Sequence, residues 1–434
     1  MNQTYVQHPD MLEATRLTRA GRLTEAMALL QGVLGGATPP GATSGTVDGA
    51  EGAPAGRAPR VIDATAETIE VTDPRPFPLT GQAFGAAGGA AGAAQPALPE
   101  ALRGFLERLG QGGGLDGLGG LARPARAPDP VPDGARFVAG TYTEPAGSRG
   151  YKLYVPSGYR DGQPVPLVVM LHGCTQSPDD FAAGTRMNAL AEEGTFLVAY
   201  PAQDGAANPQ RCWNWFSPGD QRRDAGEPSL IAGITRQIMR EHAIDPARVY
   251  AAGMSAGGAA AAVMGEAYPD LYAAVGVHSG LPCGAAGDLP SALAAMRQGA
   301  PGPATGDGRS DGGPRRLVPT IVFHGDRDGT VNPRNGDQVI ARARAAAAGE
   351  LQATAAVQHG QVPGGRAYSR ALHADAGGGA VLEQWVVHGA GHAWSGGGPA
   401  GSYTDPQGPD ATREMLRFFL EHRHLQAARV GPSE

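Results

Sequence analysis

The chain has 434 residues and a formal net charge of −7, and 18% of its residues are charged, against about 25% in average domains. This balance excludes the broad basic surface that nucleic-acid binding uses, and no apolar stretch reaches the roughly 18 residues of a transmembrane helix. The first residues lack the basic start and unbroken apolar core of a secretory signal, so we expect a cytoplasmic protein.

The N-terminal third differs in composition from the rest of the chain. Residues 11–34 carry Leu and Met at helical spacing, which predicts a helical hairpin within residues 1–35. We expect this hairpin to pack on its own chain or to self-associate, or else to dock on a partner such as the surface of a polymer granule. Residues 36–135 are rich in Gly, Ala and Pro, and such a composition is typical of a flexible linker.

From residue 136 to residue 425, short apolar runs alternate with helical patterns. This alternation predicts a three-layer α/β sandwich, in which helices cover both faces of a mainly parallel sheet. A short tail follows at 426–434. The expected strands are 137–143, 151–155, 167–171, 196–200, 249–253, 273–277, 320–323 and 382–387, and the expected helices are 228–243, 258–267 and 412–422.

A nucleophile motif lies between an expected strand and an expected helix. The segment GMSAG at 253–257 matches G-x-S-x-G, with Ser255 at its centre. The sharp turn of such a motif exposes the hydroxyl, and the helix that follows points N–H groups toward developing negative charge. We therefore predict Ser255 as the nucleophile of an α/β-hydrolase fold, although an ordinary turn with an N-cap serine gives the same pattern. A second match around Ser310 lacks a flanking strand and helix, and we interpret it as a loop serine.

A serine hydroxyl needs a base to take its proton, and in α/β-hydrolases the acid and then the histidine follow the serine along the chain. Asp326 and Asp328 follow one expected strand, and His388 and His392 follow another. Asp328 lies deeper in its loop, where it can reach a histidine, whereas Asp326 can simply shape the turn. His392 lies on a Gly-flanked loop, while His388 ends the strand itself. We predict a triad of Ser255, Asp328 and His392.

The motif HGC at 172–174 follows the strand expected at 167–171. Such a turn supplies one oxyanion N–H and the residue after the nucleophile supplies the other, which assigns Cys174 and Ala256; alternatively, the turn only ends the strand. Cys174 and Cys212 both flank the predicted site. A bridge between them would hold the HGC turn, whereas a cytosolic location favours two reduced thiols.

The chain contains the segments LHGCTQSPDDF, CWNWF, RVYAAGMSAGGAAA, AAVGVHSGLPCGAA, HGDRDGTVNP and GHAWSGG. Together these six segments resemble the poly(3-hydroxybutyrate) depolymerase family of esterases, to which feruloyl and acetylxylan esterases are related. The resemblance implies a triad of Ser255, Asp328 and His392 and an oxyanion hole that includes Cys174, which forms a disulfide in some members. In its predicted N-terminal helices and linker, the chain resembles the intracellular-type members of the family.

Three tryptophans, Trp213, Trp215 and Trp394, lie near these motifs. Aromatic rings at a serine site suit an apolar acyl chain or a stacked ring, although Trp213 and Trp215 fit buried packing equally well. We expect a neutral ester substrate, either poly(3-hydroxybutyrate) or short-chain hydroxyalkanoate oligoesters. The alternatives are an acylated carbohydrate, or a non-catalytic protein on a polymer granule. A triad transfers an acyl group to water unaided, so we expect no cofactor and no metal.

Overall fold

A computed structural model describes residues 66–70, 131–301, 317–347, 349, 351–352 and 354–424. The chain divides into two units, Met1–Ile62 and Asp63–Glu434, and all described residues belong to the second. The hairpin predicted within 1–35, the tail 426–434, Ser310 and most of the predicted linker lie outside the described residues.

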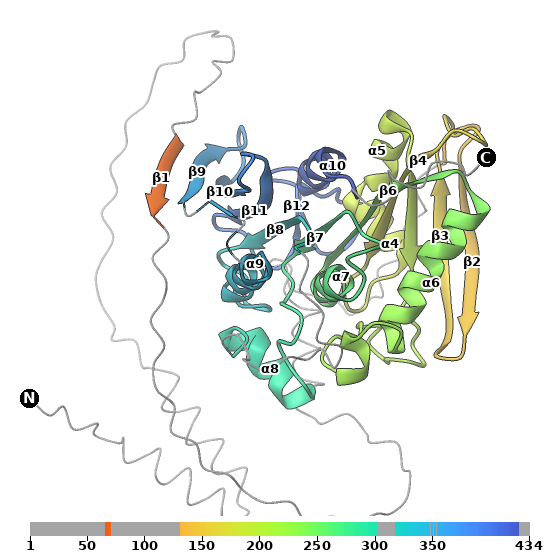
Figure 1. Ribbon diagram of the computed structural model, residues 1–434, viewed down its shortest axis with the longest axis horizontal. Helices are drawn as coiled ribbons and strands as arrows, with labels where there is room; N and C mark the ends of the chain where they lie inside the picture. Colours follow the sequence, from red (N-terminus) through yellow and green to blue (C-terminus); the bar gives the residue numbers. More distant parts are fainter. Residues whose placement is uncertain are drawn as a thin grey trace, which may run out of the picture. The chain divides into compact units, whose positions relative to one another are not determined.

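An 11-stranded sheet forms the centre of the second unit, in the order β1-β9-β10-β11-β8-β7-β6-β4-β5-β3-β2 (Figure 1). The strands from β11 to β5 in this order pair in parallel, and those at both edges pair antiparallel. The strands are β1 (Ala66–Glu70), β2 (Arg136–Glu144), β3 (Gly147–Val155), β4 (Val165–Leu171), β5 (Leu197–Pro201), β6 (Ile244–Met254), β7 (Ala274–His278), β8 (Thr320–Gly325), β9 (Thr354–Gln361), β10 (Ala367–Ala374) and β11 (Ala380–Val387). A separate short pair joins β12 (Trp394–Ser395) to β13 (Thr404–Asp405).

The sequence of β4 explains why the sheet is covered on both faces. Every residue of VPLVVML is buried, and successive side chains of a strand point to opposite faces. Leu167, Val169 and Leu171 belong to one apolar cluster, and Val168 and Met170 belong to another on the other face. The parallel centre of the sheet is therefore packed between two cores.

Helices supply the outer layers of these cores (Figure 1). Helices α6 and α7 pack on the face that Leu167 contacts, and α4, α5 and α10 pack on the face that Val168 contacts. The helices are α4 (Pro178–Thr185), α5 (Met187–Gly194), η1 (Pro218–Gln221), α6 (Gly226–Glu241), α7 (Ala256–Ala267), α8 (Leu289–Gln298), α9 (Arg334–Ala346) and α10 (Ala411–Glu421). Within the described ranges, no helix is long and apolar enough to cross a membrane.

The predicted α/β-hydrolase sandwich with a mainly parallel sheet is confirmed, and several elements add to the prediction. Strands β9 and β10 extend the sheet beyond β11, and β10 is only partly buried along most of its length, so it has no continuous apolar run. Helix α4 does carry a local signal: the Ser177 side chain accepts the Asp180 N–H, and Pro178 stands at the first helical position. Both features are typical of a helix start.

Candidate active site

Ser255 makes the turn between β6 and α7 at the carboxyl edge of the parallel strands. Its backbone has φ 57° and ψ −120°, a conformation that a residue other than glycine adopts only where the surrounding structure holds it. Strand β6 ends at Met254 and α7 begins at Ala256, so one residue reverses the chain. The predicted order of strand, sharp turn and helix is confirmed.

Glycine at position 257 allows α7 to begin directly against the end of β4. A Cβ atom there would overlap the carbonyl oxygen of Leu171, and this backbone atom cannot move aside. The same close approach brings residues 172–176, which we call the HGC loop, next to the nucleophile turn. A Cβ atom on Gly173 would lie 3.6 Å from the Cβ of Ser255.

Asp328 and His392 form a buried acid–base pair. His392 Nδ1 lies 2.7 Å from Asp328 Oδ2, and the other carboxylate oxygen accepts the N–H groups of Thr330 and Val331 at 2.9 Å each. Burial alone would raise the pKa of the Asp328 carboxyl, but the neighbouring His392 and hydrogen bonds from His324 and His392 outweigh it and hold that pKa well below its usual range. The ionised carboxylate can only accept, so His392 Nδ1 carries the proton and Nε2 of the neutral ring is a free base.

The two residues that the sequence left as alternatives lie elsewhere. His388 Nδ1 contacts Asp326, and His388 Nε2 contacts Ser369 on β10. The choice of Asp328 and His392 as partners of one another therefore agrees with the geometry.

One small cavity brings Ser255, His392 and the HGC loop together. Within the described part of the chain, no acceptor takes the N–H of Cys174 or of Ala256, so both donors are available to a bound group. This cavity therefore brings a hydroxyl and an imidazole next to the N–H of Cys174, and these groups are the equipment for acyl transfer. Its lining residues are Gly173, Cys174, Thr175, Gln176, Met254, Ser255, His392 and Tyr403.

A disulfide joins Cys174 to Cys212, with their Cα atoms 4.2 Å apart. The sequence left this pairing open, and the structure decides for the bridge. The bridge attaches the HGC loop to the segment that contains Trp213 and Trp215.

The predicted place of the three tryptophans in a substrate site is contradicted. Trp213, Trp215 and Trp394 are 0%, 6% and 1% exposed, and the cavity at Ser255 is lined by other residues. The Trp213 N–H donates to the carbonyl of His172 at 3.1 Å, and the Trp394 N–H donates to the Thr412 hydroxyl at 2.9 Å. All three rings are therefore core residues, and the polar atoms of Trp213 and Trp394 are satisfied inside the protein.

Two residues that the sequence interpretation missed also shape the site. Tyr403 lines the cavity, and its hydroxyl lies 3.2 Å from the Thr175 hydroxyl. His278, at the end of β7, accepts the Ser255 N–H with its carbonyl at 2.9 Å and stacks on Trp394. Burial lowers the pKa of His278 to about 3, so the ring stays neutral. His278 lies in one of the six segments, whereas no local pattern marks Tyr403.

Several known proteins are similar to this chain. A model of the family described as esterase PHB depolymerase matches residues 149–381, a range that includes Ser255 and Asp328 and ends before His392. Poly(3-hydroxyalkanoate) depolymerase C of Paucimonas lemoignei is 36% identical over 205 residues, which is 46% of this chain and 48% of the relative.

Carbohydrate esterases are also similar. Feruloyl esterase B of Thermothelomyces thermophilus is 32% identical over 141 residues, which is 32% of this chain and 47% of the relative. Acetyl xylan esterase from Aspergillus awamori, a solved structure, has a TM-score of 0.49 and 20% identity, and the match covers 65% of this chain and 99% of that one. The chain spans about half the length of the curated relatives described here.

Proposed function

This chain belongs to the esterase PHB depolymerase family, and on that premise we propose that it hydrolyses carboxylic esters, with Ser255 as nucleophile and hydroxyalkanoate oligoesters as substrates. The observation that carries the proposal is the cavity that Ser255, His392 and Cys174 share, together with Asp328 behind His392. The identity to poly(3-hydroxyalkanoate) depolymerase C supports the substrate class.

The reaction follows from the roles that these groups can take. His392 Nε2 removes the proton of the Ser255 hydroxyl as the oxygen attacks the ester carbonyl, and Asp328 stabilises the imidazolium. The N–H groups of Cys174 and Ala256 donate to the oxyanion, and each such donor is worth about 3 kcal/mol of barrier. His392 then returns the proton to the leaving alcohol, and water releases the acyl group by the same steps in reverse.

Hydrolysis of p-nitrophenyl esters of graded acyl length tests this proposal directly. We expect turnover with short acyl chains and its loss in Ser255→Ala. Ser369→Ala is a matched control, because Ser369 contacts His388, which in turn contacts Asp326. Ser369 does not line the cavity, so the activity of Ser369→Ala should equal that of wild type. Turnover that survives in Ser255→Ala would reject Ser255 as the nucleophile.

The substrate class needs its own comparison. We expect release of 3-hydroxybutyrate from soluble oligoesters or amorphous polymer to exceed release of ferulate or acetate from xylan fragments. The identity to feruloyl esterase B supports the second candidate, a carbohydrate esterase, and the reverse ranking would establish it.

Docking on a polymer granule is a separate part of the proposal. It is supported by the helical spacing of apolar residues at 11–34, which lie outside the described residues. Deletion of residues 1–35 should release the protein from granules and leave hydrolysis of soluble esters unchanged. Unchanged granule association after the deletion would reject this role.

A further inference from the structure

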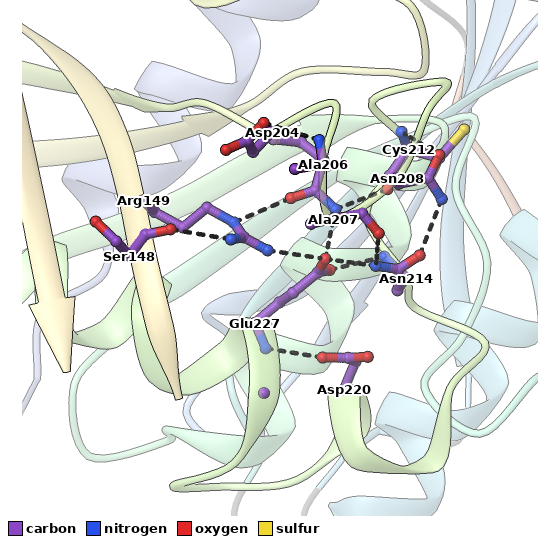
Figure 2. A network of polar contacts seen from close by, with 12 residues as sticks. Ser148, Arg149, Asp204, Ala206, Ala207, Asn208, Cys212, Asn214, Asp220 and Glu227 are labelled. Carbon is purple, nitrogen blue, oxygen red and sulfur yellow. Dashed lines mark hydrogen bonds and ion pairs between the residues drawn. The ribbon is translucent and has the colours of Figure 1, made fainter. Parts of the chain in front are cut away.

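The carboxylate of Glu227 lies in a cluster of polar groups (Figure 2). Glu227 belongs to the first turn of α6 and is 5% exposed. Its Oε2 accepts the Asn214 backbone N–H at 2.7 Å, and its Oε1 accepts the Asn214 side-chain amide at 2.8 Å and the Gln203 side-chain amide. Arg149 Nη2 on β3 lies 3.5 Å from Oε1. A carboxyl group that faces this many donors satisfies all of them only while it is ionised.

Gln203 connects this cluster to the HGC loop. Its side-chain amide donates to the Cys212 carbonyl at 2.9 Å, and its backbone N–H donates to His172 Nε2 at 3.0 Å. Because Nε2 accepts, the proton of the neutral His172 ring lies on Nδ1, which donates to the Gly173 carbonyl at 2.8 Å. Cys212 is joined to Cys174 by the disulfide. Hydrogen bonds and one covalent bridge therefore connect Gln203 to both ends of the HGC motif.

We propose that Glu227 is a positioning residue for the HGC loop: its carboxylate holds Gln203 and the segment 212–214, and thereby fixes the direction of the Cys174 N–H. This inference rests on the proposed function, which gives that N–H a part in stabilising the oxyanion. Glu227 is not among the residues that line the cavity, so it acts only through its neighbours. The consequence for rate is large, since a misplacement of about 1 Å in an active site can cost about 100-fold.

The charges around Glu227 make this device sensitive to pH. The facing groups are Arg149 from β3, Asp220 from η1, which accepts the Glu227 backbone N–H at 2.8 Å, and the neutral His172 beyond Gln203. Burial raises the pKa of Glu227 to about 7; Asp220 adds to the rise, and the hydrogen bonds of Asn214 and Gln203 and the charge of Arg149 oppose it. Burial also raises the pKa of Asp220.

Protonation of Glu227 puts a hydrogen on one of its oxygens, which then cannot accept from every donor. One connection to the HGC loop is lost, so turnover falls as the pH falls through about 7. A variant that lacks the Glu227 ionisation isolates the part of this residue in the pH dependence.

The test compares Glu227→Gln, Gln203→Ala and the wild type over pH 5.5 to 9 with p-nitrophenyl butyrate. We expect kcat of Glu227→Gln to fall by about 10- to 100-fold and KM to stay within about threefold of wild type. The acid limb of its profile of kcat against pH should lose one ionisation. Gln203→Ala should lower kcat to a similar extent but keep that ionisation. Asp204→Asn is the matched control, because Asp204 lies next to Gln203 and is exposed, and its carboxylate accepts the Ala206 N–H. Its profile should equal that of wild type.

A second measurement does not depend on turnover. The rate of fluorophosphonate labelling of Ser255 reports how well the HGC loop stabilises a developing oxyanion, and it should fall in parallel with kcat in Glu227→Gln and Gln203→Ala. Folded Glu227→Gln with wild-type kcat, pH profile and labelling rate would overturn the inference. If Glu227→Gln does not fold, a folded Gln203→Ala with wild-type kcat overturns it as well. Failure of the wild type to hydrolyse esters or to be labelled would instead reject the proposed function, and the inference with it.

Discussion

Asp326 and His388 form a pair of their own, with His388 Nδ1 3.0 Å from Asp326 Oδ2, beside the Asp328–His392 pair at 2.7 Å. Both pairs join the loop after β8 to the loop after β11. Backbone hydrogen bonds from Asp326 to Val387 and from Arg327 to Ala390 hold the same loops together. The Asp326–His388 pair is exposed, whereas the side chains of the Asp328–His392 pair are almost fully covered. Of these four residues, only His392 lines the cavity at Ser255.

The two pairs should respond differently to the same substitution. Asp328→Asn removes the acceptor that fixes the His392 tautomer, and we expect kcat to fall by about 10⁴-fold. Asp326→Asn weakens an exposed contact and should change kcat less than about tenfold, since exposed ion pairs contribute about 0.2–1 kcal/mol. Steady-state hydrolysis of a p-nitrophenyl ester measures both variants, and equal losses would contradict the separate roles.

Gly257→Ala should abolish activity. The added Cβ overlaps the Leu171 carbonyl oxygen, so the start of α7 must move away from β4, and overpacking of this kind destabilises by about 1–3 kcal/mol. Gly287→Ala is the control, because nothing lies within 4 Å of its Cβ position. Chemical denaturation gives the stability and fluorophosphonate labelling gives the reactivity of Ser255. A Gly257→Ala protein labelled at the wild-type rate would show that the close approach is dispensable.

Trp213→Phe tests the position of this ring in the core. The change leaves the buried His172 carbonyl without its donor, and an unsatisfied buried group costs about 1–3 kcal/mol. KM for short esters should not change, because the ring does not line the cavity. Tyr403→Leu should give the opposite result, a raised KM with little loss of stability. A raised KM in Trp213→Phe at wild-type stability would restore the tryptophan to the substrate site.

Acid should destabilise the fold through two buried histidines. Burial lowers the pKa of His172 to about 4 and that of His278 to about 3, against about 6.5 in an unfolded chain. Between these values each ring binds a proton in the unfolded chain but not in the folded one, so the part of the stability that these two rings contribute is complete above about pH 6.5 and is lost as the pH falls. His172 alone accounts for about 3 kcal/mol of this loss by pH 4.

Urea denaturation between pH 7.5 and pH 4.5 measures this dependence. His278→Gln should reduce the slope of the unfolding free energy against pH by nearly one proton. His359→Gln, at an exposed position, should leave this slope unchanged. An unchanged pH dependence of stability in His278→Gln would mean that the fold does not keep this buried ring neutral.

The order of the elements and the position of each reactive group along them follow from local patterns of residues. Ser255, Asp328 and His392 each follow a strand, and strands, turns and the G-x-S-x-G motif are local patterns that a few adjacent residues specify. Parallel strands bring their carboxyl ends to one edge of a sheet, so the meeting of these groups could be expected before any contact was known.

Which groups touch depends on how distant segments pack against one another. Asp328 and His392 are 64 residues apart in the chain, and the pairing of the two acids with the two histidines, the bridge between Cys174 and Cys212 and the burial of Trp213 all depend on distances between such remote segments. Glu227 shows this most clearly. A glutamate in the first turn of an amphipathic helix is ordinarily exposed. Here the segment that contains Gln203 and Asn214 packs against α6 and buries the Glu227 carboxylate. Because of this packing, we propose that Glu227 positions the HGC loop.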